Sequence, residues 1–209
     1  MRVFLGITGA SGAPYAARVL DGLVAAGAEV GLCASQAGGT VIAWELYRDR
    51  ELPGADAVAR LVAERGGGTT TAYAEDDWFS PYASGSARCD AYVVCPCSMA
   101  TCGTIAASTS ANLIHRAAAV ALKEDRRLVV VPRETPLSVI HLENMLKLAR
   151  AGAVILPPAP GFYTHPQTVD DLVDFVVARV LDQLRVPHDL VARWGAPVAA
   201  ESIPGSGSA

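Results

Sequence analysis

The chain has 209 residues, a formal net charge of −4 and 51% apolar residues. This length is compatible with one domain that buries a substantial core. The negative charge gives no electrostatic footprint for nucleic acid, so we predict no nucleic-acid partner. Every apolar run is broken before the roughly 18 residues that a membrane span requires, so we predict no membrane partner. Strand-like residues begin at Val3 in place of a signal peptide, which predicts a cytoplasmic protein.

Apolar segments alternate with helical patterns along the chain. The pattern predicts strands at 3–8, 29–35, 91–97, 127–132 and 153–157. It predicts helices at 15–27, 37–49, 56–65, 136–150 and 169–184, with two further helical pieces up to about residue 124. The polar, Gly-rich segment from about 50 to 90 is expected to hold long loops around the one short helix at 56–65.

The predicted strands are apolar on both faces, which is typical of a parallel sheet covered by crossover helices. We therefore predict a single-domain, three-layer α/β fold. The domain is expected to span residues 1–195, and a mobile Pro/Gly-rich tail is expected at 196–209.

Five cysteines, an odd number, argue against a disulfide framework. Cys95, Cys97 and Cys102 form a C-x-C-x4-C cluster, which is compatible either with zinc or with structural thiols. A fourth ligand at finger-like spacing is missing, and Cys95 lies in a buried-looking strand. The pattern favours structural thiols, and we predict no metal.

Ligands of parallel α/β sheets bind beyond the carboxyl ends of the strands. The segments that follow the five predicted strands should therefore share one edge of the sheet. These segments are 8–12, 35–36, 96–99, 133–135 and 157–163.

The segment TGASGAP (8–14) connects the first predicted strand to the first helix. Gly9 and Gly12 allow a tight turn, and Ser11 can cap the helix or donate to an anion. The segment is either a phosphate-binding turn at a helix N-terminus or an ordinary strand-to-helix turn, because it matches neither G-x-G-x-x-G nor a Walker A loop.

Several polar residues have both a functional and a structural interpretation. Ser35 and Ser98 end predicted strands and can contact a cofactor or cap the following helix. Arg116 and Lys123 lie seven residues apart on one helix face, as anion ligands or as solvated charges. Arg179 interrupts the apolar series of the last helix, as an anion ligand, a subunit contact or a solvated charge.

The segment VPRETPLS (131–138) leads from a buried strand into a helix. Thr135 is predicted as the helix N-cap and Pro136 as the first helical residue. Arg133 and Glu134 then occupy the turn at the ligand edge, where Arg133 suits phosphate or carboxylate and Glu134 can transfer protons. A local salt bridge of small value is the alternative.

The Pro-rich segment PPAPGFYTHP (157–166) cannot form regular structure and should present Phe162 and Tyr163 from a stiff loop. Thr168 and Asp171 resemble a capping box for the last helix.

The longest motifs carry a family resemblance. They are GITGASGAPYAARVL, CPCSMATCGTIA, SANLIHRAAAVALKE, VVVPRETPLSVIHLENMLKLARAGAVILPPAPGFY and PQTVDDLVDFVVARVLDQL. Together they closely resemble the UbiX-type flavin prenyltransferases, and HDLVARWG (188–195) resembles the C-terminal end of that family. The similarity covers nearly the whole chain except about 50–75 and the tail.

The resemblance implies a flavodoxin-like or Rossmann-like flavoprotein that assembles into trimers and often dodecamers, with sites between subunits. It implies a metal-independent enzyme that joins the dimethylallyl group of dimethylallyl phosphate to N5 and C6 of reduced FMN. The product, prenylated FMN, would serve a UbiD-type decarboxylase.

The resemblance also assigns roles to residues. FMN would be held by Gly9, Ala10, Ser11, Ser35, Ser98, Met99, Thr101 and Arg116. The prenyl phosphate would be held by Lys123, Arg133, Tyr163 and Arg179. Catalytic roles fall to Ser11, Glu45, Glu134 and Trp194; the two glutamates would support proton transfers and Trp194 would border the prenyl chain.

Three other functions are alternatives to this one. A peptidyl- or pantothenoyl-cysteine decarboxylase of the same superfamily would carry an early histidine, whereas the first histidine here is His115. An accessory subunit of an aromatic-acid decarboxylase would need no aromatic-acid site of its own. A non-catalytic flavin-binding regulator would have little use for the four prenyl-phosphate residues together.

Overall fold

The structure is a computed structural model that describes residues 1–193. Trp194, the end of the predicted domain at residue 195 and the predicted tail at 196–209 lie outside the described residues. The strands are β1 (Arg2–Ile7), β2 (Glu29–Ala34), β3 (Thr70–Tyr73), β4 (Ala91–Cys97), β5 (Arg127–Pro132) and β6 (Val154–Ile155). The helices are α1 (Ala13–Ala25), α2 (Gln36–Tyr47), α3 (Gly54–Arg65), α4 (Met99–Ala106), α5 (Leu113–Lys123), α6 (Val139–Arg150), α7 (Val169–Leu184) and the short 3-10 helix η1 (Pro81–Ala83).

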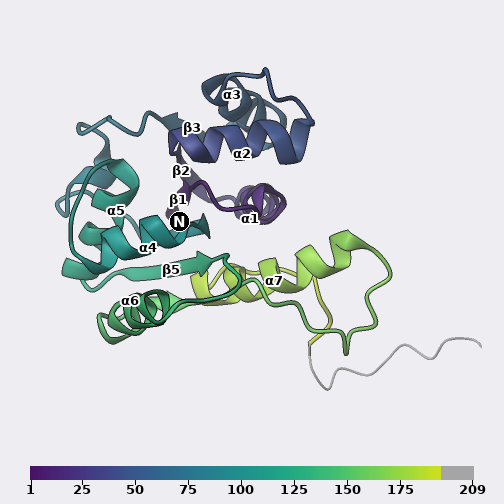
Figure 1. The fold of residues 1–209 in the computed structure, drawn as a ribbon. Helices are drawn as coiled ribbons and strands as arrows, with labels where there is room; N and C mark the ends of the chain where they lie inside the picture. Colours follow the sequence, from purple (N-terminus) through teal and green to yellow (C-terminus); the bar gives the residue numbers. More distant parts are fainter. Residues whose placement is uncertain (194–209) are drawn as a thin grey trace, which may run out of the picture.

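The six strands form one parallel sheet in the order β3-β2-β1-β4-β5-β6. The chain first builds outward from β1 to β3, and then returns to place β4 on the other side of β1 (Figure 1). The order therefore reverses between β1 and β4, which is the topological switch point where such sheets bind ligands. The predicted three-layer α/β fold is confirmed.

Successive strand residues point to opposite faces of the sheet and fill two separate cores. On β1, Val3 and Leu5 pack with residues of α1, α2, α3 and α7. Phe4 points to the other face and packs with residues of α4, α5 and α6. All three side chains are buried. Because both faces are covered, the strands are apolar throughout, as expected for a parallel sheet.

The predicted boundaries match the structure best where the pattern is long and apolar, at β4, β5 and α7. The last of these begins with the predicted capping box: Thr168 Oγ1 accepts from Asp171 N–H, and Asp171 accepts from Thr168 N–H. Within residues 1–193, no helix is both long enough and apolar enough to cross a membrane.

Two predictions about elements were wrong. The segment from 50 to 90 contains a further strand, β3, which pairs with β2 at the edge of the sheet. Helix α6 begins at Val139, so Thr135 is not its N-cap and Pro136 is not its first residue. Ser138 is the cap because its Oγ accepts from His141 N–H at 3.2 Å while His141 Nδ1 accepts from Ser138 N–H.

The three clustered cysteines are buried thiols in the two cores. Burial raises the pKa of Cys95 to about 12 and that of Cys102 to about 11. These side chains therefore stay protonated near neutral pH, as buried packing residues do.

Gly31 on β2 leaves the space that the Tyr82 ring occupies. A Cβ at Gly31 would overlap the ring of the fully buried Tyr82. That ring also packs on Phe4 and Tyr73, with centroids 5.1 and 5.5 Å away. The aromatic cluster fastens the segment after β3 to the centre of the sheet.

We predict that Gly31→Ala lowers the free energy of unfolding by about 1–3 kcal/mol, because the packed ring cannot move aside without strain. Urea denaturation followed by circular dichroism measures the change. Gly103→Ala on α4 is the matched control, since its Cβ would meet only the Asn144 amide at 3.2 Å. Equal stability of Gly31→Ala and the wild type would contradict the packing described.

Candidate active site at the carboxyl edge of the sheet

Hydrogen bonds tie together the segments that follow the strands. Thr8 Oγ1 donates to Pro96 O at 2.9 Å and accepts from Ser98 N–H at 2.7 Å. Farther along the edge, Arg133 N–H donates to Cys97 O at 3.2 Å. The segments after β1, β4 and β5 therefore form one continuous edge across the switch point. Thr8 lay within a predicted ligand segment, but its residue type gave no sign of this bridging role.

The N-terminus of α1 is occupied by a carboxylate from α2. Glu45 Oε2 accepts from Gly12 N–H and from Ala13 N–H, each at 2.8 Å. Gly12, with φ of 134°, is the N-cap and supplies no side chain, so Ser11 is not the cap. A negative charge at a helix N-terminus is favourable, which explains why an acid lies there. The two donors expected for a phosphate thus bind the protein's own Glu45.

Ser35 and Ser98 have the structural role that was the alternative to cofactor contact. Ser35 Oγ accepts from Gly38 N–H at 3.1 Å and begins α2. Ser98 Oγ accepts from Thr101 N–H at 3.2 Å and begins α4. Both serines stand at the carboxyl edge, so capping fixes their hydroxyls beside any ligand bound there.

The other residues expected to contact FMN also follow β1 and β4. Ala10, Met99 and Thr101 are buried. A Cβ at Gly9 would lie 2.6 Å from the Ala37 Cβ, so the backbone after β1 runs unusually close to the start of α2. Only glycine permits this close approach, which packs the segment after β1 against the first turn of α2.

Arg133 and Glu134 do not pair with each other; within residues 1–193 each has a different partner. Arg133 Nε donates to the carbonyl oxygen of Ser11 at 3.0 Å. Glu134 accepts from the Thr135 N–H at 3.0 Å and is exposed. The local salt bridge is therefore not formed, and Arg133 instead reaches across the switch point to the segment after β1.

Sequence reasoning missed Glu75, which follows β3. Its carboxylate accepts from Gln36 N–H and from the Asn112 side-chain amide, each at 3.3 Å, and its carbonyl accepts from Leu113 N–H at 2.7 Å. Glu75 thus joins the first turns of α2 and α5. It also places Arg116 at the carboxyl edge, where the guanidinium donates to Ala83 O at 2.8 Å. Glu75 was not predicted because β3, the strand that precedes it, was not predicted.

Lys123 and Arg179 lie toward the opposite end of the sheet, where the parallel strands begin. Lys123 ends α5 just before β5 begins and forms an ion pair with Glu124. Arg179 forms an ion pair with Asp182 at 2.9 Å on the second half of α7. That end of α7 lies at the amino end of β5, because Arg127 donates to Gln183 O. One chain therefore does not bring Lys123 or Arg179 to Arg133.

Tyr163 lies in the Pro-rich loop after β6, as predicted. Its ring packs edge-on against Phe175 of α7, with centroids 5.6 Å apart, and is 58% exposed. The neighbouring Phe162 is 70% exposed. The loop presents both aromatic side chains outward at the carboxyl edge, where another molecule can contact them.

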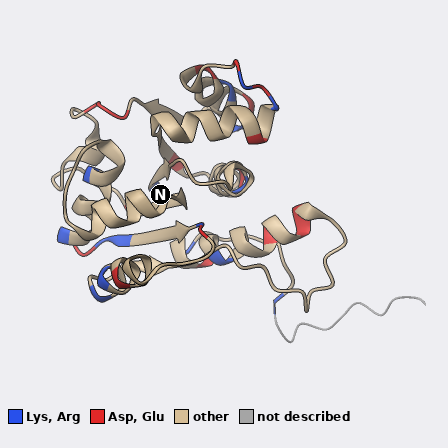
Figure 2. Ribbon diagram, in the orientation of Figure 1, with Lys and Arg blue, Asp and Glu red and all other residues tan. Residues whose placement is uncertain are grey.

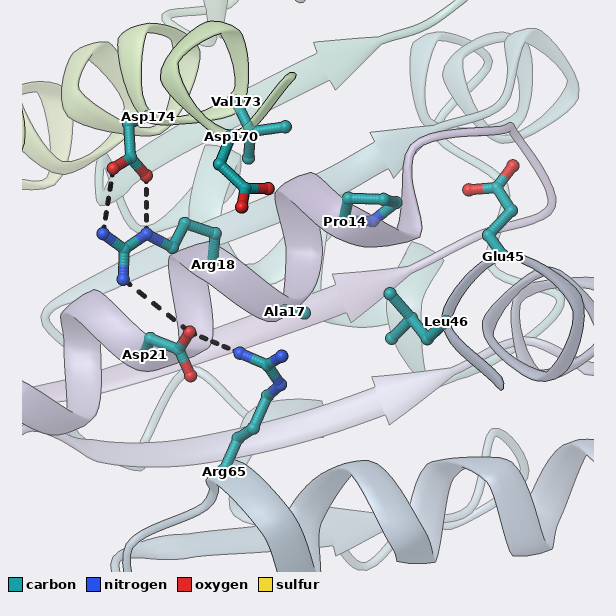
Figure 3. A pocket seen from close by; sticks show the side chains of 10 residues that line it. All are labelled: Pro14, Ala17, Arg18, Asp21, Glu45, Leu46, Arg65, Asp170, Val173 and Asp174. Atoms are coloured by element: carbon teal, nitrogen blue, oxygen red, sulfur yellow. Dashed lines mark hydrogen bonds and ion pairs between the residues drawn. The ribbon is translucent and has the colours of Figure 1, made fainter. Parts of the chain in front are cut away.

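A cavity of about 510 Å³ is lined by residues of α1, α2, α3 and α7, Glu45 among them. Arg18 holds Asp174 with two hydrogen bonds, at 2.5 and 2.9 Å, and Arg65 holds Asp21 at 2.6 Å. Figure 3 shows these ion pairs gathered at one end of the cavity and Glu45 at the other, apart from them. Arg18 and Arg65 are paired with Asp174 and Asp21, so this network connects α1, α3 and α7. Glu45 takes no part in it and instead binds the N-terminus of α1.

Basic and acidic side chains are interleaved over the molecule. Figure 2 shows Lys and Arg on several elements, with Asp and Glu nearby, rather than along one continuous stripe.

Comparisons with known proteins agree on one family. The flavoprotein family model matches residues 1–181. Flavin prenyltransferase UbiX of Pseudomonas aeruginosa is 52% identical over 198 residues, covering 93% of this chain and 94% of that protein. The UbiX of Halalkalibacterium halodurans is 47% identical, covering 91% and 92% respectively.

Solved structures give the same result. A UbiX crystal structure in complex with FMN and dimethylallyl pyrophosphate has a TM-score of 0.83 and 38% identity, covering 94% of this chain and 98% of that chain. A dodecameric FMN-dependent UbiX-like decarboxylase from Escherichia coli O157:H7 has a TM-score of 0.82 and 43% identity, covering 94% and 100%. A PPC decarboxylase in complex with pantothenoylaminoethenethiol, at 20% identity and a TM-score of 0.53, shares the fold alone.

We predict that Glu45→Ala lowers the free energy of unfolding by about 1–3 kcal/mol, because two N–H groups lose a charged acceptor. Glu45→Gln should lower the free energy of unfolding by less, since its amide oxygen can still accept from the two N–H groups. Chemical denaturation measures both changes. Glu51→Ala is the control, because Glu51 is exposed and its side chain has no hydrogen bond within residues 1–193. A Glu45→Ala protein as stable as this control would contradict the capping role.

Proposed function

The chain belongs to the flavin prenyltransferases of the flavoprotein family, and from that premise we propose the site and the reaction steps that follow. The protein joins a dimethylallyl group to N5 and C6 of reduced FMN and releases prenylated FMN. The observation that carries the proposal is the contact between Arg133 and Ser11 at the switch point. This contact places the planar guanidinium of Arg133 beside Ser11, in the segment that is expected to hold the flavin.

The carboxyl edge fits FMN. The capped first turns of α2 and α4 present Ser35 and Ser98, and Arg116 lies in the first turn of α5. Helix N-termini with hydroxyl and guanidinium groups suit a phosphate. Gly9, Ala10, Ser11, Met99 and Thr101 would complete the contacts. Reduced FMN supplies the nucleophilic atoms N5 and C6.

The protein's part is to bind, orient and polarise the prenyl donor. When the allylic C–O bond breaks, negative charge develops on the departing phosphate, and fixed cations stabilise it. Arg133 is held in place by Ser11, so its position is set before the donor arrives. Tyr163 would donate a hydrogen bond to the same phosphate. Glu134, exposed beside Arg133, would take and return protons.

The remaining cations would come from neighbouring copies. Lys123 and Arg179 lie away from Arg133 in one chain, so a shared donor phosphate requires a second subunit. Helix α6 offers a surface for that contact: Val139, Ile140 and Leu142 are 69%, 67% and 50% exposed. Exposed apolar side chains in such number mark association sites. A trimer-based homo-oligomer, as large as a dodecamer, would complete each site.

The product would pass to a UbiD-type decarboxylase, because a modified flavin is useful only to an enzyme that takes it as cofactor. We place this exchange in the cytoplasm, where the five unpaired cysteines would remain thiols. Trp194, outside the described residues, stays a prediction as a border of the prenyl chain.

The reaction is tested by mass spectrometry of the flavin. Anaerobic incubation of the protein with reduced FMN and dimethylallyl phosphate should increase the flavin mass by one prenyl group. Dimethylallyl pyrophosphate should be tested in parallel, since a relative binds that donor. Unchanged flavin with both donors would overturn the proposed reaction.

Arg133→Ala should lower kcat/KM for the prenyl donor by about tenfold to a hundredfold while leaving the dissociation constant of FMN nearly unchanged, because a charged hydrogen bond to the departing phosphate is lost. Steady-state kinetics and flavin fluorescence measure the two quantities. The exposed Arg150 at the end of α6 supplies the control, Arg150→Ala. Loss of FMN binding with an unchanged kcat/KM for the donor would reverse the assignment.

A further inference from the structure

An open cleft of about 470 Å³ lies beside the edge that carries Ser11 and Glu45. Its walls come from the start of α1, the end of α2 and the start of α7. This cleft adjoins the ion-pair cavity of Figure 3, and Pro14, Glu45, Asp170 and Val173 border both. Its size is within the range of small-molecule sites.

The largest apolar side chain in the cleft is Trp44, the residue before Glu45 on α2. Its indole is 43% exposed. The guanidinium carbon of Arg50 lies over the ring, 4.4 Å from the centroid, in a cation–π contact that holds the indole in place. A large aromatic side chain that is half-exposed and held from one side forms a fixed wall.

Two valines of α7 supply further apolar lining. Val169 is 74% exposed and Val173 is buried, and both border the same cleft as Trp44. The charged residues Glu45, Arg48 and Asp170 also border the cleft, and these three apolar side chains form the hydrocarbon and aromatic part of its lining. Such a lining suits a branched hydrocarbon chain, and an electron-poor allyl group gains further from the indole face.

We propose that Trp44 contacts the prenyl chain of the donor and limits the length of chain that the enzyme accepts. The inference rests on the proposed function and adds a specificity-determining residue to it. Ser11 borders the cleft, and its carbonyl oxygen accepts from Arg133. A donor phosphate bound by Arg133 would therefore lie at the Ser11 end of the cleft. The chain then extends into the cleft, and Trp44 is the bulky group that a longer chain meets.

The alternative is that Trp44 packs against a neighbouring copy in the assembly. In that case its removal changes the oligomer and not the choice of donor. The two roles therefore differ in their readouts, and both can be measured on the same preparation.

The test compares dimethylallyl phosphate with geranyl phosphate as donors for the wild type, Trp44→Ala and Trp44→Phe. In Trp44→Ala, the ratio of kcat/KM for dimethylallyl over geranyl phosphate should fall by at least about tenfold, with an intermediate fall in Trp44→Phe. The dissociation constant of FMN should stay at the wild-type value. Trp78→Ala is the matched control, since Trp78 is 48% exposed and does not border this cleft.

The outcomes separate the two proposals. A wild-type protein that leaves the flavin unchanged with either donor overturns the proposed function, and this inference with it. Active Trp44 variants with the wild-type donor ratio overturn the inference alone, as does a changed oligomer by light scattering with no change in that ratio. If Trp44→Ala does not fold, Trp44→Phe decides on the same ratio.

Discussion

The parallel direction of all six strands is the constraint on which the site depends. Every segment that follows a strand lies at one edge of the sheet, and every segment that precedes one lies at the other. Arg133 follows β5 and Lys123 precedes it, so the strand itself separates them. If both bind one phosphate, they must belong to different copies of the chain. In this account assembly is therefore part of the catalytic site.

At the edge that one chain does complete, the segment after β1 is fixed from three directions. Thr8 is bonded to β4, the Ser11 carbonyl accepts from Arg133 of the β5 segment, and Glu45 of α2 holds the N–H groups at the start of α1. Each contact joins residues far apart in the sequence. The segment is thus ordered by its neighbours before any ligand binds, which lowers the entropy lost on binding.

The periodic apolar pattern was sufficient to predict the fold class and most elements, because β4, β5 and α7 are long and buried. It missed β3, since this edge strand has only four residues and exposes Thr71 and Ala72. Glu75, just after it, was therefore missed. Family motifs named Arg133 and Ser11 separately, but a contact across 122 positions follows only from the sheet order. The start of α6 was misplaced because Thr135 and Ser138 are both good caps, and only packing selects between them.

The central claim is that each donor site takes residues from more than one subunit. Coexpression of Lys123→Ala and Arg133→Ala chains, followed by isolation of the mixed oligomer, tests it most directly. Each variant alone should form little prenylated FMN, whereas the mixed oligomer should regain activity, because some sites then contain an intact Lys123 from one copy and an intact Arg133 from another. Mixed oligomers no more active than the two parent variants would contradict the account.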